Sequence, residues 1–396
     1  MSTLRKSLIA AAAVAFAGAA APAFAAGDDL IASLPDPLKA LYVDASQGLL
    51  PSAYDSFTPK AKPWKWCHSE SYQGNPWRVS LTAELKRLVD GLIAKGDAAS
   101  FEVSDSNGDV SQQINQIRAF IESGCSIITS IPGSSTGLDE VIKAAYDAGI
   151  PFVTISSYVT SPYAINVDSN YSRWGLEMME AIAKSLDGKG SILLVEGIAG
   201  APIVAMEREG AEKILAQNPG LTVSRSVNGN WTANVTKTVV LQALATNPAP
   251  IDAVWTTGSE ARVVAEAFAE AGRPAPVITG SITGDSLGYW KANPDKFRFE
   301  GHAVLPGWNA QALFRVGLRI LEGQKPKLNV IMIPIPAVAG ADLGKWYQDC
   351  MTPDSVSVFP VPPTDPMPEE LMDAYFTNPA PTGFDYSQVP GACAAK

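Results

Sequence analysis

Aromatic and amide side chains gather around the end of a predicted strand and the start of the helix that follows it. Residues 64–69 read as a short strand, and Asn75 and Pro76 are typical of the N-cap and the first turn of a helix. Tyr72 and Trp77 flank this helix start. In open α/β sheets, loops that join the carboxyl end of a strand to a helix N-terminus bind ligands. We therefore expect Tyr72, Asn75 and Trp77 to face a binding cleft, where the rings stack on a solute and the amide forms hydrogen bonds.

Side chains that could carry acid–base catalysis are few. His68 and Ser69 are neighbours on the predicted strand, so their side chains point to opposite faces and cannot work as a pair. His302 with Glu300 is the other candidate pair, and no nucleophile elbow, phosphate loop or zinc-protease motif occurs. Two histidines and scattered cysteines provide no metal-ligand spacing. We expect no enzymatic activity, no metal and no cofactor.

The N-terminus has the three parts of a secretory signal peptide. Arg5 and Lys6 form the charged region, residues 7–21 the apolar region, and residues 23–25 (Ala-Phe-Ala) the cleavage site. We expect residues 1–25 to be removed and the mature protein to be periplasmic, with no membrane insertion, because no later stretch is apolar for long enough to span a bilayer. The formal net charge of −10 argues against nucleic acid as a partner.

Four cysteines in an exported chain predict disulfide bonds. Cys350 and Cys393 both lie in a proline-rich C-terminal segment with little core of its own, and we expect these two to pair. Cys67 and Cys125 then either pair with each other or remain buried thiols, and the sequence leaves both possibilities open.

Strand and helix patterns alternate in two successive series. The first begins at Trp64, and the second restarts with a helix over residues 173–186. Two such series predict an α/β protein with two doubly wound parallel sheets. Residues 26–61 form an N-terminal extension interrupted by prolines, and residues 346–396 form a Pro-rich C-terminal tail with no long periodic segment.

Several short motifs occur in an order that points to one family. They are Asn75-Pro76-Trp77, the turn Gly149-Ile150-Pro151, the run Ile165-Asn166-Val167-Asp168, Gly197-Ile198-Ala199-Gly200, and Leu305-Pro306. Together, behind a signal peptide, they resemble the ribose-binding-protein type of periplasmic solute-binding protein, the type I sugar-binding family that serves ABC importers. The resemblance covers about residues 62–345.

The resemblance implies two lobes joined by a three-segment hinge that closes on a ligand. Lobe 1 would contain residues 62–167 and 306–335, and lobe 2 would contain residues 168–305 and 336–345. The implied partners are a small-molecule ligand and a membrane ABC permease, with the binding protein acting as a monomer.

Some positions depart from the pattern of the sugar-binding members. After two of the strands, the resemblance implies an Asp-Arg pair and an Asn-Asp pair that bind hydroxyl groups, and this sequence has other residues at both places. The arginine implied in the helix after Gly200 is not cleanly matched, since Met206, Glu207 and Arg208 compete for the position. The residues at the two strand ends are Ser156, Ser157 and Tyr158 after the first, and Gly258, Ser259 and Glu260 after the second.

The predicted ligand site therefore combines aromatic rings with a few polar groups. Trp231 and Trp308 stand at strand ends or first helical turns, where their rings can stack on a solute. The remaining candidates are Ser156, Ser157, Tyr158, Ser259 and Glu260. A sugar or polyol is the ligand that the resemblance implies. A less polar, aromatic or modified ligand, or presentation of the ligand to a chemoreceptor, is the alternative.

Overall fold

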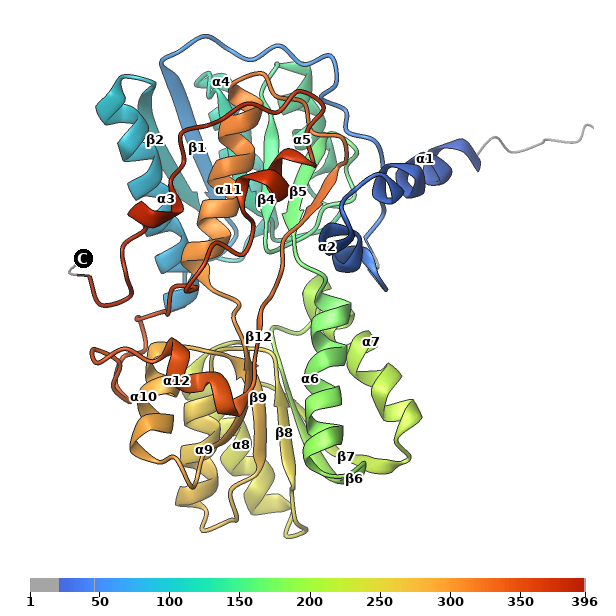
Figure 1. The fold of residues 1–396 in the computed structure, drawn as a ribbon, viewed down its shortest axis with the longest axis vertical. Coiled ribbons are helices and arrows are strands. Elements are labelled where there is room, and N and C mark those ends of the chain that lie inside the picture. Colours follow the sequence, from blue (N-terminus) through green and yellow to red (C-terminus); the bar gives the residue numbers. More distant parts are fainter. Residues whose placement is uncertain (1–20, 46, 395–396) are drawn as a thin grey trace, which may run out of the picture.

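The computed structural model describes residues 21–45 and 47–394, which form two α/β lobes one above the other (Figure 1). Each lobe is built on a six-stranded sheet with helices packed against it. The two series of alternating strands and helices in the sequence thus form two sheets, which confirms the predicted fold class. Residues 1–20 of the predicted signal peptide lie outside the described residues, and residues 21–25 belong to the helix α1, Ala21–Ala32.

The first lobe contains an all-parallel sheet with the strand order β11-β5-β4-β3-β1-β2. Its central strands are buried along their whole length, as expected for a parallel sheet covered by helices on both faces. The strands are β1 Trp64–Glu70, β2 Ala98–Asp105, β3 Ile127–Ile131, β4 Phe152–Ile155, β5 Ala164–Asp168 and β11 Val330–Met332, and the helices are α3 Pro76–Lys95, α4 Val110–Glu122, α5 Asp139–Asp147 and α11 Pro306–Leu321.

The second lobe has the strand order β12-β10-β9-β8-β6-β7. All its pairings are parallel except that of β12, which joins β10 in the antiparallel direction. The strands are β6 Lys189–Glu196, β7 Gly220–Asn228, β8 Ala253–Thr256, β9 Val277–Ser281, β10 Arg298–His302 and β12 Ala337–Val338, and the helices are α6 Tyr171–Ser185, α7 Pro202–Gln217, α8 Ala233–Thr246, α9 Ala261–Glu270 and α10 Gly284–Ala292.

The chain crosses between the sheets three times: after β5, after β10 and after β11. Two of these segments are hydrogen-bonded side by side, since Ile333 N donates to Asp168 O at 2.8 Å. The crossing after β10 is hydrogen-bonded to the crossing after β11, since Ala303 N donates to Pro336 O at 2.8 Å. These short connections lie between the carboxyl ends of the two sheets, so the ends of both sets of strands face one junction (Figure 1).

The helix α3 begins as the sequence predicts. Asn75 is its N-cap, with its side chain accepting a hydrogen bond from Arg78 N, and Pro76 is its first residue. Gly96 ends the helix in the left-handed conformation, with φ of 77°. Trp64 and Trp66 of the preceding strand are buried in the core.

The segment before β1 is packed against the first lobe. Leu38 and Tyr54 are buried in its core, and the Tyr54 hydroxyl donates to Tyr163 O at 2.7 Å. Pro51 forms an isolated bridge with Leu328 next to β11. The short helical turns of this segment are α2 Asp36–Lys39 and η1 Ala40–Tyr42.

The C-terminal tail connects the two lobes. Figure 1 shows it running from α12 on the second lobe to α13 beside α11 on the first. Buried Arg315 and Arg319 of α11 form ion pairs with three acidic residues of the tail, and Met367 and Tyr375 enter the core. The acidic partners are Asp365, Glu369 and Asp373, and the short elements are η2 Gly340–Asp342, α12 Leu343–Trp346, α13 Glu369–Asp373 and η3 Tyr386–Gln388.

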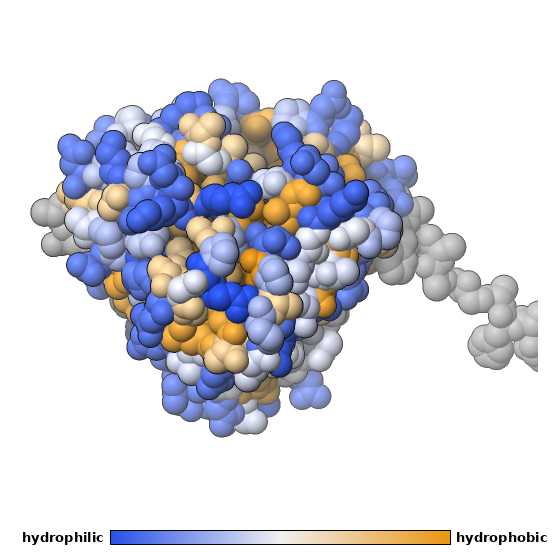
Figure 2. Space-filling view, turned by 90° about the horizontal axis from the view of Figure 1, so that it is seen from below, coloured by the Kyte–Doolittle hydropathy of each residue, from blue (hydrophilic) through white to orange (hydrophobic). Residues whose placement is uncertain are grey.

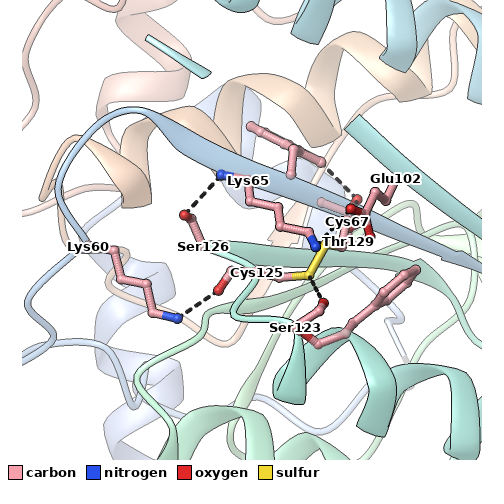
Figure 3. The surroundings of a disulfide bond; sticks show 10 residues. Lys60, Lys65, Cys67, Glu102, Ser123, Cys125, Ser126 and Thr129 are labelled. Carbon is pink, nitrogen blue, oxygen red and sulfur yellow. Dashed lines mark hydrogen bonds and ion pairs between the residues drawn. A yellow bond between two sulfur atoms is a disulfide. The ribbon is translucent and has the colours of Figure 1, made fainter. Parts of the chain in front are cut away.

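Both pairs of cysteines form disulfides. Cys350–Cys393 confirms the predicted tail bridge, and Cys67–Cys125 resolves the open alternative in favour of pairing. Figure 3 shows the Cys67–Cys125 disulfide, which joins β1 to the loop that leads into β3. Lys60 Nζ donates to Cys125 O at 2.8 Å.

Loss of the tail bridge is expected to destabilise the protein. Replacing Cys350 and Cys393 with serine removes a crosslink over a sequence separation of 43 residues. In the chain-entropy model such a crosslink contributes about 3–4 kcal/mol. Urea unfolding should therefore show a lower midpoint than for the native protein. An unchanged midpoint would mean that packing alone holds the tail in place and that the disulfide adds no stability.

The end of the molecule formed by the second lobe carries hydrophilic and apolar residues intermixed (Figure 2). Within residues 21–45 and 47–394, no helix is both long and apolar enough to cross a membrane.

Candidate functional site

A cavity of about 950 Å³ lies at the junction of the two lobes. Its lining comes mainly from the loops and helix starts that follow the strands of both sheets. Eight of the ten side chains predicted from the sequence line it: Tyr72, Asn75, Trp77, Ser156, Ser157, Trp231, Ser259 and Glu260.

The wall from the first lobe is formed by the loop before α3 and by its first turn. Asn75 caps the helix through Oδ1, which accepts from Arg78 N at 3.0 Å. The Trp77 indole N–H donates to Val304 O at 2.9 Å, in the segment that follows β10. Trp77 therefore lines the cavity and also links the first lobe to the crossing segment.

The wall from the second lobe is dominated by the ring of Trp231. Cβ atoms added at Gly197 and Gly258 would lie only 2.1 and 2.8 Å from that ring, so the indole fits only because both positions are glycine. Trp231 itself has φ of 49°, a conformation that a bulky side chain rarely adopts. A strained backbone that displays an aromatic ring into a cavity is typical of a binding site.

Two carboxylic side chains, Glu207 of α7 and Glu260 before α9, are buried at this wall. Burial raises the pKa of Glu207 well above its usual range; the Thr257 hydroxyl opposes this shift, and the acidic side chains of Glu196 and Glu260 add to it. Burial likewise raises the pKa of Glu260 to about 8. Glu260 therefore favours its protonated form at neutral pH, and the pKa of Glu207 is shifted in the same direction.

The serines after β4 are held by hydrogen bonds within the first lobe. Ser156 has φ of 53°, and its Oγ accepts from Asn309 Nδ2 at 3.0 Å. Ser157 Oγ donates to Pro132 O at 2.9 Å. Besides Asn309, the Ser156 hydroxyl interacts with the Tyr171 hydroxyl, which also lines the cavity.

The structure places two predicted residues outside the cavity. The Tyr158 hydroxyl hydrogen-bonds to Gly48, donating to its carbonyl at 3.3 Å and accepting from its N–H at 3.1 Å. Trp308 is 2 % exposed and belongs to the hydrophobic core. The sequence does not reveal that the N-terminal segment packs beside Tyr158, or that the first turn of α11 faces inward.

Several lining residues were not predicted from the sequence. Tyr171 and Trp174 come from the first turn of α6, and Glu207 comes from the second turn of α7. Val356 and Phe359 come from the C-terminal tail, which thus reaches the edge of the cavity. The sequence indicated a ligand-facing position at Met206, Glu207 or Arg208, and Glu207 is the one that lines the cavity. The tail residues belong to no recognisable motif.

The residues considered for catalysis lie apart from the cavity. His68 is buried, with Nδ1 3.0 Å from Thr129 Oγ1 and Nε2 3.1 Å from Glu70 Oε1. Neither His68 nor Ser69 lines the cavity. In the described part of the chain, no group of three or more His, Cys, Asp or Glu side chains is arranged to hold a metal ion.

Residues 69–301 match the model of a family described as "Periplasmic binding protein domain". The chain belongs to this family. Among curated relatives of this periplasmic binding protein, the xylitol-binding protein of Mycolicibacterium smegmatis is 26% identical over 203 residues, covering 51% of this chain and 58% of the relative. The galactofuranose-binding protein of Escherichia coli is 25% identical, covering 50% of this chain and 67% of the relative. The alignments thus span between about half and two thirds of these proteins.

Solved structures share the fold of this chain. An ABC transporter solute binding protein from Thermobispora bispora has a TM-score of 0.68 and 27% identity, covering 74% of this periplasmic binding protein and 90% of that chain. A Bacillus halodurans solute binding protein with bound myo-inositol has a TM-score of 0.64 at 21% identity, covering 73% and 99%, and shows the shared fold.

The buried acids predict how the stability of the empty protein depends on pH. The carboxyl of Glu260 titrates at 4.5 in its unperturbed form and at about 8 in the fold, so the folded state holds its proton more tightly. The free energy of unfolding should therefore fall as the pH rises from about 4.5 to about 8. Because the entropy of unfolding grows with chain length, each kcal/mol lost lowers the melting temperature by about 1 °C in a protein of this size.

Calorimetric scans at several pH values check this dependence. The slope should be shallower in Glu260→Gln, which keeps the shape of the side chain and cannot ionise. An equal slope in both proteins would assign the dependence to other groups.

Proposed function

We propose that this chain is the periplasmic substrate-binding component of an ABC transporter, which captures a small sugar or polyol between its two lobes. One observation carries the proposal: aromatic rings and buried polar groups line the same cavity at the facing strand ends of both sheets. A sugar or polyol offers C–H groups to the rings and hydroxyl groups to the polar side chains.

The names of the relatives support this ligand class, because two of them are described as binding xylitol and galactofuranose. The name of the Thermobispora structure supports an ABC permease as the membrane partner. Family membership supports a periplasmic location and a binding role rather than an enzymatic one.

The proposed mechanism is closure of the lobes around the solute. Trp77 and Trp231 come from opposite lobes, so a ligand stacked on both rings stabilises the closed form more than the open one. Hydrogen bonds would come from Asn75, Ser156 and Ser157 on one side and from Ser259 and Glu260 on the other. The three crossing segments are short enough to act as the hinge.

A thermal-shift screen with xylitol, glucitol, myo-inositol, ribose, glucose and galactose tests the proposal, followed by calorimetry on any hit. A ligand present at 100 times its Kd adds about 2.7 kcal/mol to the stability of the folded state. We expect at least one of these compounds to raise the melting temperature and to reduce the radius of gyration in X-ray scattering. No shift with any of them at millimolar concentration would contradict the proposal.

A further inference from the structure

Two acidic side chains face the cavity without a partner of opposite charge. Glu207 is 1 % exposed, and within the part of the chain that the structure describes neither of its carboxyl oxygens has a partner in good hydrogen-bond geometry; the neutral Thr257 hydroxyl lies near enough to lower its pKa but brings no charge. Glu260 is 5 % exposed and takes part in none of the ion pairs found there. Both side chains line the second-lobe wall of the cavity, and the nearby Glu260 carboxyl raises the pKa of Glu207.

The positive side chains around the cavity are already neutralised. Three of them line it, and each lies within 3.1 Å of a carboxylate oxygen other than those of Glu207 and Glu260. Arg208, next to Glu207 in sequence, is directed to Glu196 and Glu212 instead. The three pairings are Arg78 with Glu70 at 3.1 Å, Lys237 with Glu270 at 3.0 Å, and Arg262 with Glu266 at 2.6 Å and Asp285 at 2.8 Å.

A buried carboxyl without a partner is costly, and a ligand that supplies the missing hydrogen bonds removes this cost. A neutral hydroxyl can donate one hydrogen bond but brings no charge, whereas a protonated amine brings three donors and the missing positive charge. Aromatic rings also attract a cation, and Trp231 lies beside Glu260: a Cβ atom added at Gly258 would be 1.9 Å from Glu260 Oε2 and 2.8 Å from the Trp231 ring.

We propose that the solute carries a protonated amine next to its hydroxyl groups, and that Glu207 and Glu260 bind this amine. The ligand class is thus an amino sugar or an amino polyol. This inference rests on the proposed function and narrows the chemistry of the same site.

Proton exchange on binding distinguishes such a ligand from a neutral one. The groups that face Glu207 are Tyr171, Glu196, Thr257 and Glu260, and Asp285 faces Glu260. Apart from the hydroxyls these groups are acidic, so the empty site holds protons. An entering ammonium group lowers the pKa of both glutamates and releases a proton near neutral pH, whereas a polyol leaves the protons in place.

The experiment compares matched probes: glucitol with 1-amino-1-deoxyglucitol, and glucose with glucosamine. Calorimetry at pH 7 in two buffers of different ionisation enthalpy gives the affinity and the number of protons released. We expect an amine to bind at least about tenfold more tightly than its hydroxyl counterpart, a difference of about 1.4 kcal/mol, and with proton release.

Two variants on α7 complete the test. Glu207→Gln should remove most of the preference for the amine over its hydroxyl counterpart, and Glu209→Gln, at an exposed position of the same helix, should keep the preference of the native protein. Thermal unfolding checks that both variants fold. The measurement of proton release uses the native protein, so it tests the inference even if a variant does not fold.

Each outcome has one meaning. Binding of the neutral probes with equal or higher affinity, or amine binding without proton release, overturns the amine inference and leaves the proposed function standing. Binding of none of the four probes, together with no hit in the thermal-shift screen, contradicts the proposed function itself.

Discussion

Replacing Gly210 with alanine is expected to destabilise the second lobe by about 3 kcal/mol or more. A Cβ atom at this position would lie 1.8 Å from the backbone oxygen of Ser172, and one at Gly175 would lie 1.9 Å from the backbone oxygen of Glu207. The backbones of α6 and α7 therefore touch at both glycines, and a methyl group forces the helices apart. Because Glu207 lies on α7, the same displacement should also weaken ligand binding.

Gly91→Ala provides the matched control, since it makes the same change inside a helix. Gly91 lies on α3, and a Cβ atom there meets nothing within 4 Å. Alanine at this position should stabilise the protein by about 0.4–1 kcal/mol. Chemical unfolding measures both changes. A Gly210→Ala variant as stable as the native protein would show that α6 and α7 can separate at little cost.

Trp231→Ala is expected to weaken binding of the solute identified by the screen at least about tenfold, because it removes an aromatic ring from the second-lobe wall of the cavity. The ring lies over Gly197 and Gly258, so its removal also leaves a gap between the ends of β6 and β8. Loss of this surface should favour the open form of the lobes. Calorimetric titration gives the change in Kd.

Trp346→Ala, on α12 and outside the cavity lining, serves as the control for loss of a tryptophan. It should leave Kd within about twofold, a difference smaller than 0.5 kcal/mol. If both variants bind like the native protein, Trp231 does not contact the ligand.

Local sequence signals were sufficient to predict most of the fold. Buried strands such as β3 and β4 are short and rich in large apolar residues, and the start of α3 has Asn75 and Pro76 at the positions that stereochemistry favours. The packing of the tail could not be predicted. Its buried residues lie between prolines without helical or strand periodicity, and its acidic residues pair with buried arginines that are distant in sequence.

In the candidate site, too, local sequence signals predicted some residues, whereas others depend on packing between segments that are distant in sequence. Residues that end the loop between a strand and the next helix, such as Asn75 and Glu260, could be placed at the cavity because parallel strands end at one edge of a sheet. Glu207 and Trp174 depend on how closely α6 and α7 pack, and this contact is encoded by Gly175 and Gly210 rather than by a motif. Tyr158 was assigned to the cavity by its place after β4, but the N-terminal segment binds its hydroxyl.

A crystal structure of the protein with the tightest-binding solute from the screen tests the central claim most directly. We expect density for the solute in the cavity between the lobes, in contact with Trp77 on one side and Trp231 on the other, with Glu207 or Glu260 hydrogen-bonded to it. A solute bound on the outer surface of either lobe, with the cavity empty, would contradict the account.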